Sequence, residues 1–79
     1  MKQNIKAFIY REDDGYVVEC SDVNASTQGD SLDDAVANLQ EVIALALEDE
    51  DPAAYGLVNN PSILVTLELE PLRRAGEAA

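Results

Sequence analysis

The chain has 79 residues, of which 16 are Asp or Glu, 5 are Lys or Arg and none is His, giving a formal net charge of −11 at pH 7. This length allows one small domain, and a hydrophobic content of 47 % argues against disorder. Direct binding to nucleic acid or to anionic membranes is disfavoured, because neutralising phosphates requires basic side chains. The charge favours a basic protein partner instead.

The first predicted elements are three short strands. Residues 4–11 are apolar on both sides if extended, which predicts a well-covered strand. An Asp-Gly turn, with Gly15 as the residue tolerant of positive φ, leads to a second strand over residues 16–20. The two runs form a hairpin. A third strand is predicted over residues 26–28, where Gly29 ends it by freeing the backbone.

The clearest pattern is a helix that begins after Ser31. The Ser31 hydroxyl is expected to cap it, with Asp34 reaching back in a capping box. Helical spacing of apolar residues predicts about 17 to 20 residues, ended by Pro52. The predicted buried stripe is Leu32, Ala35, Val36, Leu39, Val42, Ile43, Ala46 and Leu47. Leu45, on the polar side, is a minor candidate for a subunit contact.

The last predicted element is a strand. Residues 51–60 are expected to form a loop whose Tyr55 and Leu57 pack onto the core. Alternation over residues 62–70 then predicts a strand. Its inward side chains are expected to be Ile63, Val65, Leu67 and Leu69, and its outward ones Leu64, Thr66, Glu68 and Glu70. Residues 71–79 are expected to be a flexible tail, so that one domain spans residues 1–70.

These elements predict an α+β domain: a mostly antiparallel sheet of three to four strands with one α-helix packed on one face, in the order β-β-β-α-β. One helix covers only one face. The open face would carry Phe8, Tyr10, Val17 and Leu64. We expect a second copy, in a homodimer or homotetramer, or another protein, to shield part of that face.

The residue inventory excludes the commonest catalytic sites. Without His there is no Ser-His-Asp or Cys-His arrangement and no typical zinc site. The single Cys20 lies in a predicted strand and is expected to be a buried, inert thiol. The glycines are isolated, so no phosphate-binding loop is formed. We expect no cofactor and no metal, and a soluble cytoplasmic protein, since neither a signal peptide nor a membrane span is evident.

Carboxylates are the one plentiful functional group. A pair could act as acid and base or hold Mg²⁺, and the possible members are Asp13, Asp14, Glu19, Asp22, Asp30, Glu68 and Glu70. Their spacing follows turns and solvent-facing positions, so a solvated surface is expected and a carboxylate metallonuclease is the weaker alternative. The run Glu48, Asp49, Glu50 and Asp51 is either solvated charge or a docking patch for a basic partner.

The stretches over residues 14–20, 26–35 and 38–41 resemble the HicB family of bacterial antitoxins. In that family, a glycine turn and a strand lead to a serine/threonine-Gln-Gly-acid segment and then to a helix that opens with paired acids. The matching residues, for which we expect structural roles, are Gly15, Tyr16, Gln28, Gly29, Asp30, Ser31, Ala35, Asn38, Leu39 and Glu41. The resemblance covers about residues 5–70, and Val42 and Ala46 depart from the family pattern.

The resemblance implies a partial ribonuclease-H-like fold without nuclease activity. It also implies a partner, because antitoxins of this family bind and mask a small basic ribonuclease toxin. Larger members append a DNA-binding domain; because nine residues follow Glu70, we do not expect such a domain here. Two functions are therefore expected: an antitoxin-like module that neutralises a basic toxin, or a stand-alone homo-oligomeric domain without a toxin.

Overall fold

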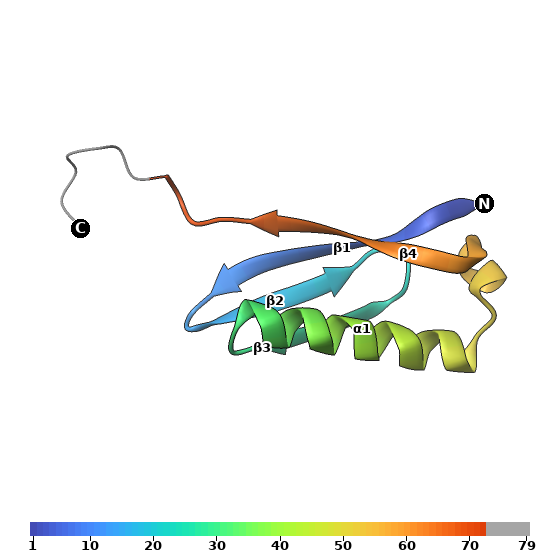
Figure 1. The fold of residues 1–79 in the computed structure, drawn as a ribbon, viewed down its shortest axis with the longest axis horizontal. Coiled ribbons are helices and arrows are strands. Elements are labelled where there is room, and N and C mark those ends of the chain that lie inside the picture. The colour runs from blue at the N-terminus through green and yellow to red at the C-terminus, as the bar shows by residue number, and fades with distance from the viewer. Residues whose placement is uncertain (73–79) are drawn as a thin grey trace.

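A computed structural model describes residues 1–72 of the chain as four strands, one α-helix and a short 3-10 helix (Figure 1). The elements are β1 (Lys2–Glu12), β2 (Gly15–Cys20), β3 (Ala25–Gly29), α1 (Leu32–Asp49), η1 (Pro52–Tyr55) and β4 (Leu57–Glu68). The α+β class and the β-β-β-α-β order are therefore confirmed. Beyond Leu72, the predicted flexible tail lies outside the described residues.

The four strands form one mixed sheet in the order β3-β2-β1-β4. The β1–β2 and β2–β3 pairs are antiparallel, as predicted, whereas β4 runs parallel to β1. The helix explains this difference. Its 18 residues span about 27 Å, so α1 carries the chain from the end of β3 back along the sheet, and β4 starts in the direction of β1 and β3 (Figure 1).

The core lies between α1 and one face of the sheet. Its fully buried residues are Ile5, Ala7, Ile9, Val18, Val23, Ala35, Leu39, Ile43 and Leu57. The helix packs mainly on β3 and to a lesser extent on β2. In Figure 1, β4 forms the edge of the sheet opposite the edge on which the helix packs. Within residues 1–72, the edge of the sheet that β4 forms is consequently left without a helix above it.

Several residues predicted to be inside are therefore exposed. Val65 and Leu67 pair with Ala7 and Ile9 and share their face, yet they are 39 % and 37 % exposed. Leu69, predicted to be inward, follows the end of β4 and is exposed. Leu32 and Val36 of α1, also predicted to be buried, are exposed as well, and Leu32 lines the same pocket as Leu67 and Leu69. The physical reason is the position of α1 over β3 rather than over the middle of the sheet.

The segment predicted as a loop over residues 51–60 is more ordered than expected. Asp51 caps η1 by accepting a hydrogen bond from Ala53 N at 2.9 Å, and Gly56 takes a left-handed conformation at φ 73°. Strand β4 then begins at Leu57, five residues earlier than predicted. Long-range pairing decides this, because Lys2 N donates to Gly56 O at 2.8 Å. Tyr55 and Leu57 pack on the core as predicted.

Pro61 lies inside β4, although the sequence predicts that the strand begins only after it. An edge strand tolerates it, because the missing N–H can face away from the neighbouring strand.

Within residues 1–72, no helix is long and apolar enough to cross a bilayer.

Candidate functional site

The acidic run at the end of α1 forms an exposed surface. Glu48 and Asp49 lie in the last turn, Glu50 is the C-cap residue, and Asp51 caps η1 with one carboxylate oxygen. The last turn of α1 carries no basic residue. These four residues, which we call the 48–51 patch, thus place four negative charges at the negative end of the helix dipole. The like charges and the helix dipole make this end of α1 a favourable place for a cationic group to approach.

A second acidic surface, at the opposite end of the sheet, consists of residues that are distant in sequence and are brought together by folding. The β1–β2 turn brings Glu12, Asp13 and Asp14 close to Asp30, which follows β3, around an open depression of about 500 Å³. We call these four residues the hairpin-end patch. All four are exposed. The sequence alone gives Asp13, Asp14 and Asp30 only as separate candidate carboxylates and does not single out Glu12, because Asp30 is far from the turn in sequence.

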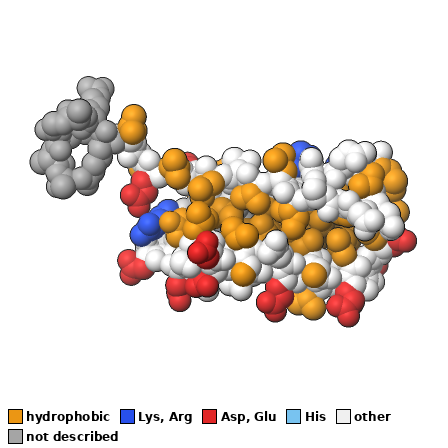
Figure 2. All heavy atoms as spheres, viewed as in Figure 1, with side chains coloured by type: hydrophobic (Ala, Val, Ile, Leu, Met, Phe, Trp, Pro, Cys, Tyr) orange, Lys and Arg blue, Asp and Glu red, His pale blue; other side chains and the backbone are white. Residues whose placement is uncertain are grey.

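The acidic side chains have few basic partners. Among the described residues, two ion pairs form: Lys2 Nζ with Asp22 at 2.7 Å, and Arg11 with Glu70 at 3.7 Å. Arg11 also stacks on the Tyr16 ring, with its guanidinium carbon 5.3 Å from the ring centroid. In Figure 2, acidic side chains are seen along the lower edge, where α1 lies, and towards the ends of the molecule. Neither acidic patch contains a residue that forms an ion pair within residues 1–72.

The candidate carboxylates do not come together as a metal or acid–base site. Asp13, Asp14 and Asp30 border the hairpin-end depression, whereas Glu68 and Glu70 lie near Arg11 at the end of β4. Glu19 lies opposite Phe8 across the β1–β2 pair. Over residues 1–72, no group of three or more Asp, Glu or Cys side chains has the geometry to hold a metal ion.

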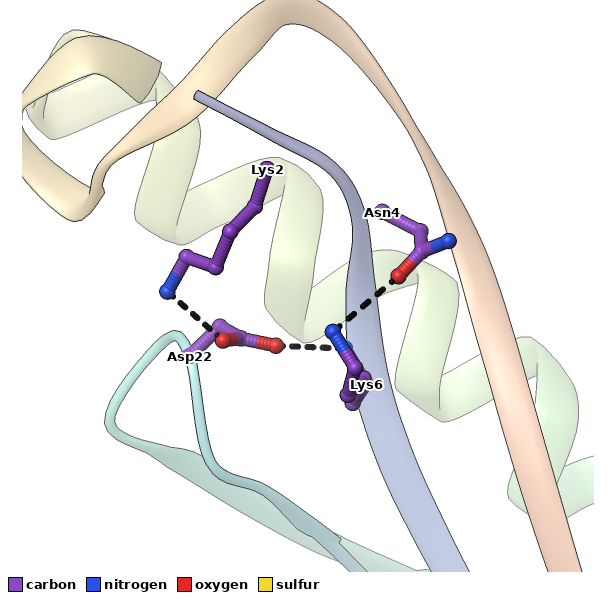
Figure 3. A network of polar contacts seen from close by, with 4 residues as sticks. All are labelled: Lys2, Asn4, Lys6 and Asp22. Carbon is purple, nitrogen blue, oxygen red and sulfur yellow. Dashed lines mark hydrogen bonds and ion pairs between the residues drawn. The ribbon is translucent and has the colours of Figure 1, made fainter.

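Asp22 has a structural role. Its carboxylate accepts a hydrogen bond from Lys2 Nζ and another from the Lys6 backbone N–H, both at 2.7 Å, as Figure 3 shows. Lys6 in turn donates from Nζ to Asn4 Oδ1. The hydrogen bond from Lys2, followed by that from Lys6, lowers the pKa of Asp22 below its ordinary value. Asp22 therefore ties the β2–β3 loop, with the buried Val23, to β1.

Replacing Asp22 with Ala is expected to destabilise the protein by about 2 kcal/mol at neutral pH, since a charge-assisted pair is lost. Asp22→Asn retains an acceptor for the Lys6 N–H and is expected to cost about half as much. Because the folded pKa is lowered, the stabilisation is present above the ordinary Asp pKa and is lost as the pH falls below about 4. Urea unfolding of both variants at neutral and acidic pH measures this. A difference from the native chain that persists at acidic pH contradicts the assignment.

Cys20 is half-buried on the core rather than fully buried as predicted. Burial, and then the negative charge of Asp22, raise the pKa of its thiol. The thiol form is therefore favoured over the reactive thiolate at neutral pH.

The open face of the sheet carries the four residues predicted there. Tyr10 and Val17 are directly opposite each other on β1 and β2, and Phe8 lies edge-on to Tyr10 with ring centroids 5.9 Å apart. Leu64 lies on β4, opposite Lys6, and is 52 % exposed. The fold thus brings these residues onto one face, and a subunit contact there stays a prediction.

Most residues of the motif identified between Gly15 and Glu41 gather where β3 meets α1. Ser31 Oγ accepts a hydrogen bond from Asp34 N at 3.1 Å, which confirms the cap, although the return bond expected of a capping box is not seen in the described chain. Asn38 Nδ2 donates to Gln28 O at 2.7 Å and so joins the helix to β3. Ala35 and Leu39 are buried beneath this junction, and Glu41 is exposed.

The two motif glycines are required for close approach rather than for backbone freedom, which corrects the expectation from sequence. Positive φ occurs at Asp13 (52°) and Gly56, not at Gly15 or Gly29. A Cβ on Gly15 would lie 2.8 Å from Gly29 O. A Cβ on Gly29 would lie 2.8 Å from Ala35 Cα and would also meet Ala35 N. The motif is therefore a packing device between strand and helix.

Comparison with protein-family models, with curated proteins and with solved structures finds no significant match. What the chain does must therefore be inferred from its residues and from their arrangement.

Proposed function

We propose that this chain is a non-enzymatic, cytoplasmic antitoxin-like module that binds and neutralises a small basic ribonuclease toxin. The proposal follows from the HicB-like motif together with the exposed acidic surface. The observation that carries it is the 48–51 patch, in which four adjacent exposed carboxylates lie at a helix C-terminus without a basic residue in the same turn.

The chemistry of the partner follows from this field. A ribonuclease must attract the phosphate backbone of RNA, so its substrate surface is rich in Lys and Arg. A protein with a net charge of −11 and exposed carboxylates presents the same kind of charge as that backbone. It can therefore occupy the RNA-binding surface of a basic enzyme and exclude the substrate, with association accelerated by electrostatic steering.

The direct experiment is to express the chain with the protein encoded by the neighbouring gene and to determine the mass of the complex. If that neighbour is a small basic ribonuclease, its cleavage of RNA is expected to stop when the acidic chain is added in equimolar amount. Binding that is unaffected by salt would count against charge complementarity. A neighbour that remains fully active in the presence of excess acidic chain would reject the antitoxin function.

The role of the 48–51 patch is tested by replacing its residues with amides, in the variant Glu48→Gln, Asp49→Asn, Glu50→Gln, Asp51→Asn. We expect the association rate with the toxin to fall about tenfold at low salt, with a smaller change in the dissociation rate. Asn at position 51 can still accept the hydrogen bond from Ala53 N, so the fold of η1 is preserved. Stopped-flow binding at several salt concentrations measures both rates.

The hairpin-end patch provides the matched control. The variant Glu12→Gln, Asp13→Asn, Asp14→Asn, Asp30→Asn also removes four negative charges, so its net charge equals that of the 48–51 variant. Asn at position 13 suits the positive φ there. If the 48–51 patch is the docking site, the control associates faster than the patch variant at equal ionic strength. Equal slowing by both variants would show that only the overall charge matters.

A stand-alone homo-oligomeric domain is the second candidate function. It is favoured by the apolar side chains that the single helix leaves uncovered, on β4 and on the open face of the sheet. If this candidate is correct, the chain self-associates and no basic toxin is encoded beside it.

A further inference from the structure

The longest stretch of the chain without a charged residue covers residues 52–67 and includes all of β4 except its last residue. In a molecule of net charge −11, such a stretch is unusual. Because β4 pairs with β1 on one side only, it is an edge of the sheet. Along its outer side, alternate backbone N–H and C=O groups have no partner strand within the described chain.

Edge strands are normally protected, and the two edges of this sheet differ in this respect. β3 has five residues, lies against α1, and has one carbonyl, that of Gln28, occupied by the Asn38 side chain. β4 has 12 residues, and between Pro61 and Glu68 it carries no Lys, no Pro and no charge. The usual devices that prevent strand pairing are therefore missing from residues 62–67.

Both faces of this edge are apolar and exposed. Leu64 lies on the open face, whereas Val65 and Leu67 lie on the core face, beside the zone that α1 leaves uncovered. In Figure 2, hydrophobic side chains form a band along the molecule between α1 and β4. Leu32, Leu67 and Leu69 line a pocket of about 350 Å³ between α1 and the end of β4. A strand added beside β4 would cover side chains on both faces.

We infer that β4 pairs antiparallel with β4 of a second copy of this chain, so that two four-stranded sheets become one. This inference goes beyond the proposed antitoxin function and does not depend on it. The pattern of residues 62–68 is self-complementary about Val65, as a two-fold interface requires. In that register Val65 faces Val65, Leu67 faces Ile63 and Thr66 faces Leu64.

The same register avoids electrostatic repulsion between two acidic copies. Glu68, the only carboxylate within residues 62–68, lies opposite Ser62 of the other copy, so no carboxylate of the paired stretch is directly opposite another. The two helices come to lie on the same side of the joined sheet. The uncovered zones next to Val65 and Leu67 then meet at the two-fold axis, where each copy shields the other.

Sedimentation equilibrium of the full chain, from micromolar to millimolar concentration, is expected to show a monomer–dimer equilibrium. Val65→Lys and Thr66→Lys place a charge on opposite faces of the edge and are each expected to raise the dimer dissociation constant about 100-fold or more. Each lysine also lowers the net negative charge, which by itself strengthens self-association. Dissociation of the dimer in these variants would therefore result from the charge placed at the strand edge and not from the change in net charge. Retained helical circular dichroism shows that the variants fold.

Two control variants carry the same change elsewhere. Leu45→Lys on the outer side of α1, where Leu45 is 56 % exposed, and Phe8→Lys on the open face are expected to leave the dimer intact. Ser62→Lys places a lysine opposite Glu68 in the Val65-centred register and is expected to tighten the dimer about twofold to fivefold. The inference is overturned if the native chain is monomeric throughout, or if Phe8→Lys dissociates the dimer while Val65→Lys and Thr66→Lys do not.

Discussion

Gly29→Ala is expected to be among the most damaging single methyl additions in this protein, with a loss of about 3 kcal/mol in the free energy of unfolding. The new Cβ would lie 2.8 Å from Ala35 Cα and 2.9 Å from the Asp34 carbonyl carbon, besides meeting Ala35 N. These are backbone atoms, so no rotamer change relieves the contact and α1 must move away from β3. Thermal and urea unfolding of the variant measure the loss.

Gly56→Ala is the matched control, since it adds the same methyl group at another glycine. Its φ of 73° imposes local strain, but the nearest atom to the new Cβ is the flexible Lys2 Cε at 3.6 Å. We expect a cost of about 1 kcal/mol. Ala35→Gly is not expected to rescue Gly29→Ala, because the clash is with the backbone of Ala35. Equal stability of the two alanine variants, or rescue by Ala35→Gly, would show that the junction is not tightly packed.

Leu39→Ala is expected to cost about 3 kcal/mol, because the side chain is 1 % exposed at the centre of the only described helix–sheet interface. Small domains have total stabilities of roughly 5 to 15 kcal/mol, so this variant is expected to be partly unfolded near physiological temperature. The loss arises from the removed apolar contacts and from the cavity left between α1 and β3. Urea unfolding followed by circular dichroism measures it.

Leu45→Ala makes the same chemical change on the same helix, six residues further along. Leu45 is 56 % exposed, so the expected change in stability is within about 0.5 kcal/mol. If both variants lose similar stability, α1 does not pack through the face that bears Leu39. A loss of self-association on Leu45→Ala would instead indicate a contact on the outer side of the helix.

Sequence reasoning was most accurate where the relevant interactions are local. The helix was predicted because the Ser31 cap and the spacing of Ala35, Leu39 and Ile43 depend on residues within one or two turns. The β1–β2 hairpin follows in the same way from two β-prone runs separated by a short turn. The roles of the motif glycines were misjudged, because the atoms that approach Gly29 belong to a different element.

In the candidate site, too, groups that are adjacent in sequence could be predicted and groups that folding brings together could not. The 48–51 patch could be found from sequence because its four carboxylates are adjacent in the chain. The hairpin-end patch could not, since Asp30 reaches Asp13 and Asp14 only after β2 and β3 have paired. From the sequence, Asp22 is one of several possible catalytic acids. Only its hydrogen bonds with Lys2 and Lys6 show that it holds the β2–β3 loop against β1.

The amino-acid order alone therefore determined the charge, the succession of the four strands and α1, and the inner side of the last strand, since all three depend on composition and near neighbours. Tertiary structure decided that β4 runs parallel to β1 at an edge and that α1 lies over β3. Alternation can show that Val65 and Leu67 point to the core face, but burial depends on whether another element lies above that face. Among the described residues no element lies above Val65 and Leu67, so these side chains remain exposed on the edge strand β4.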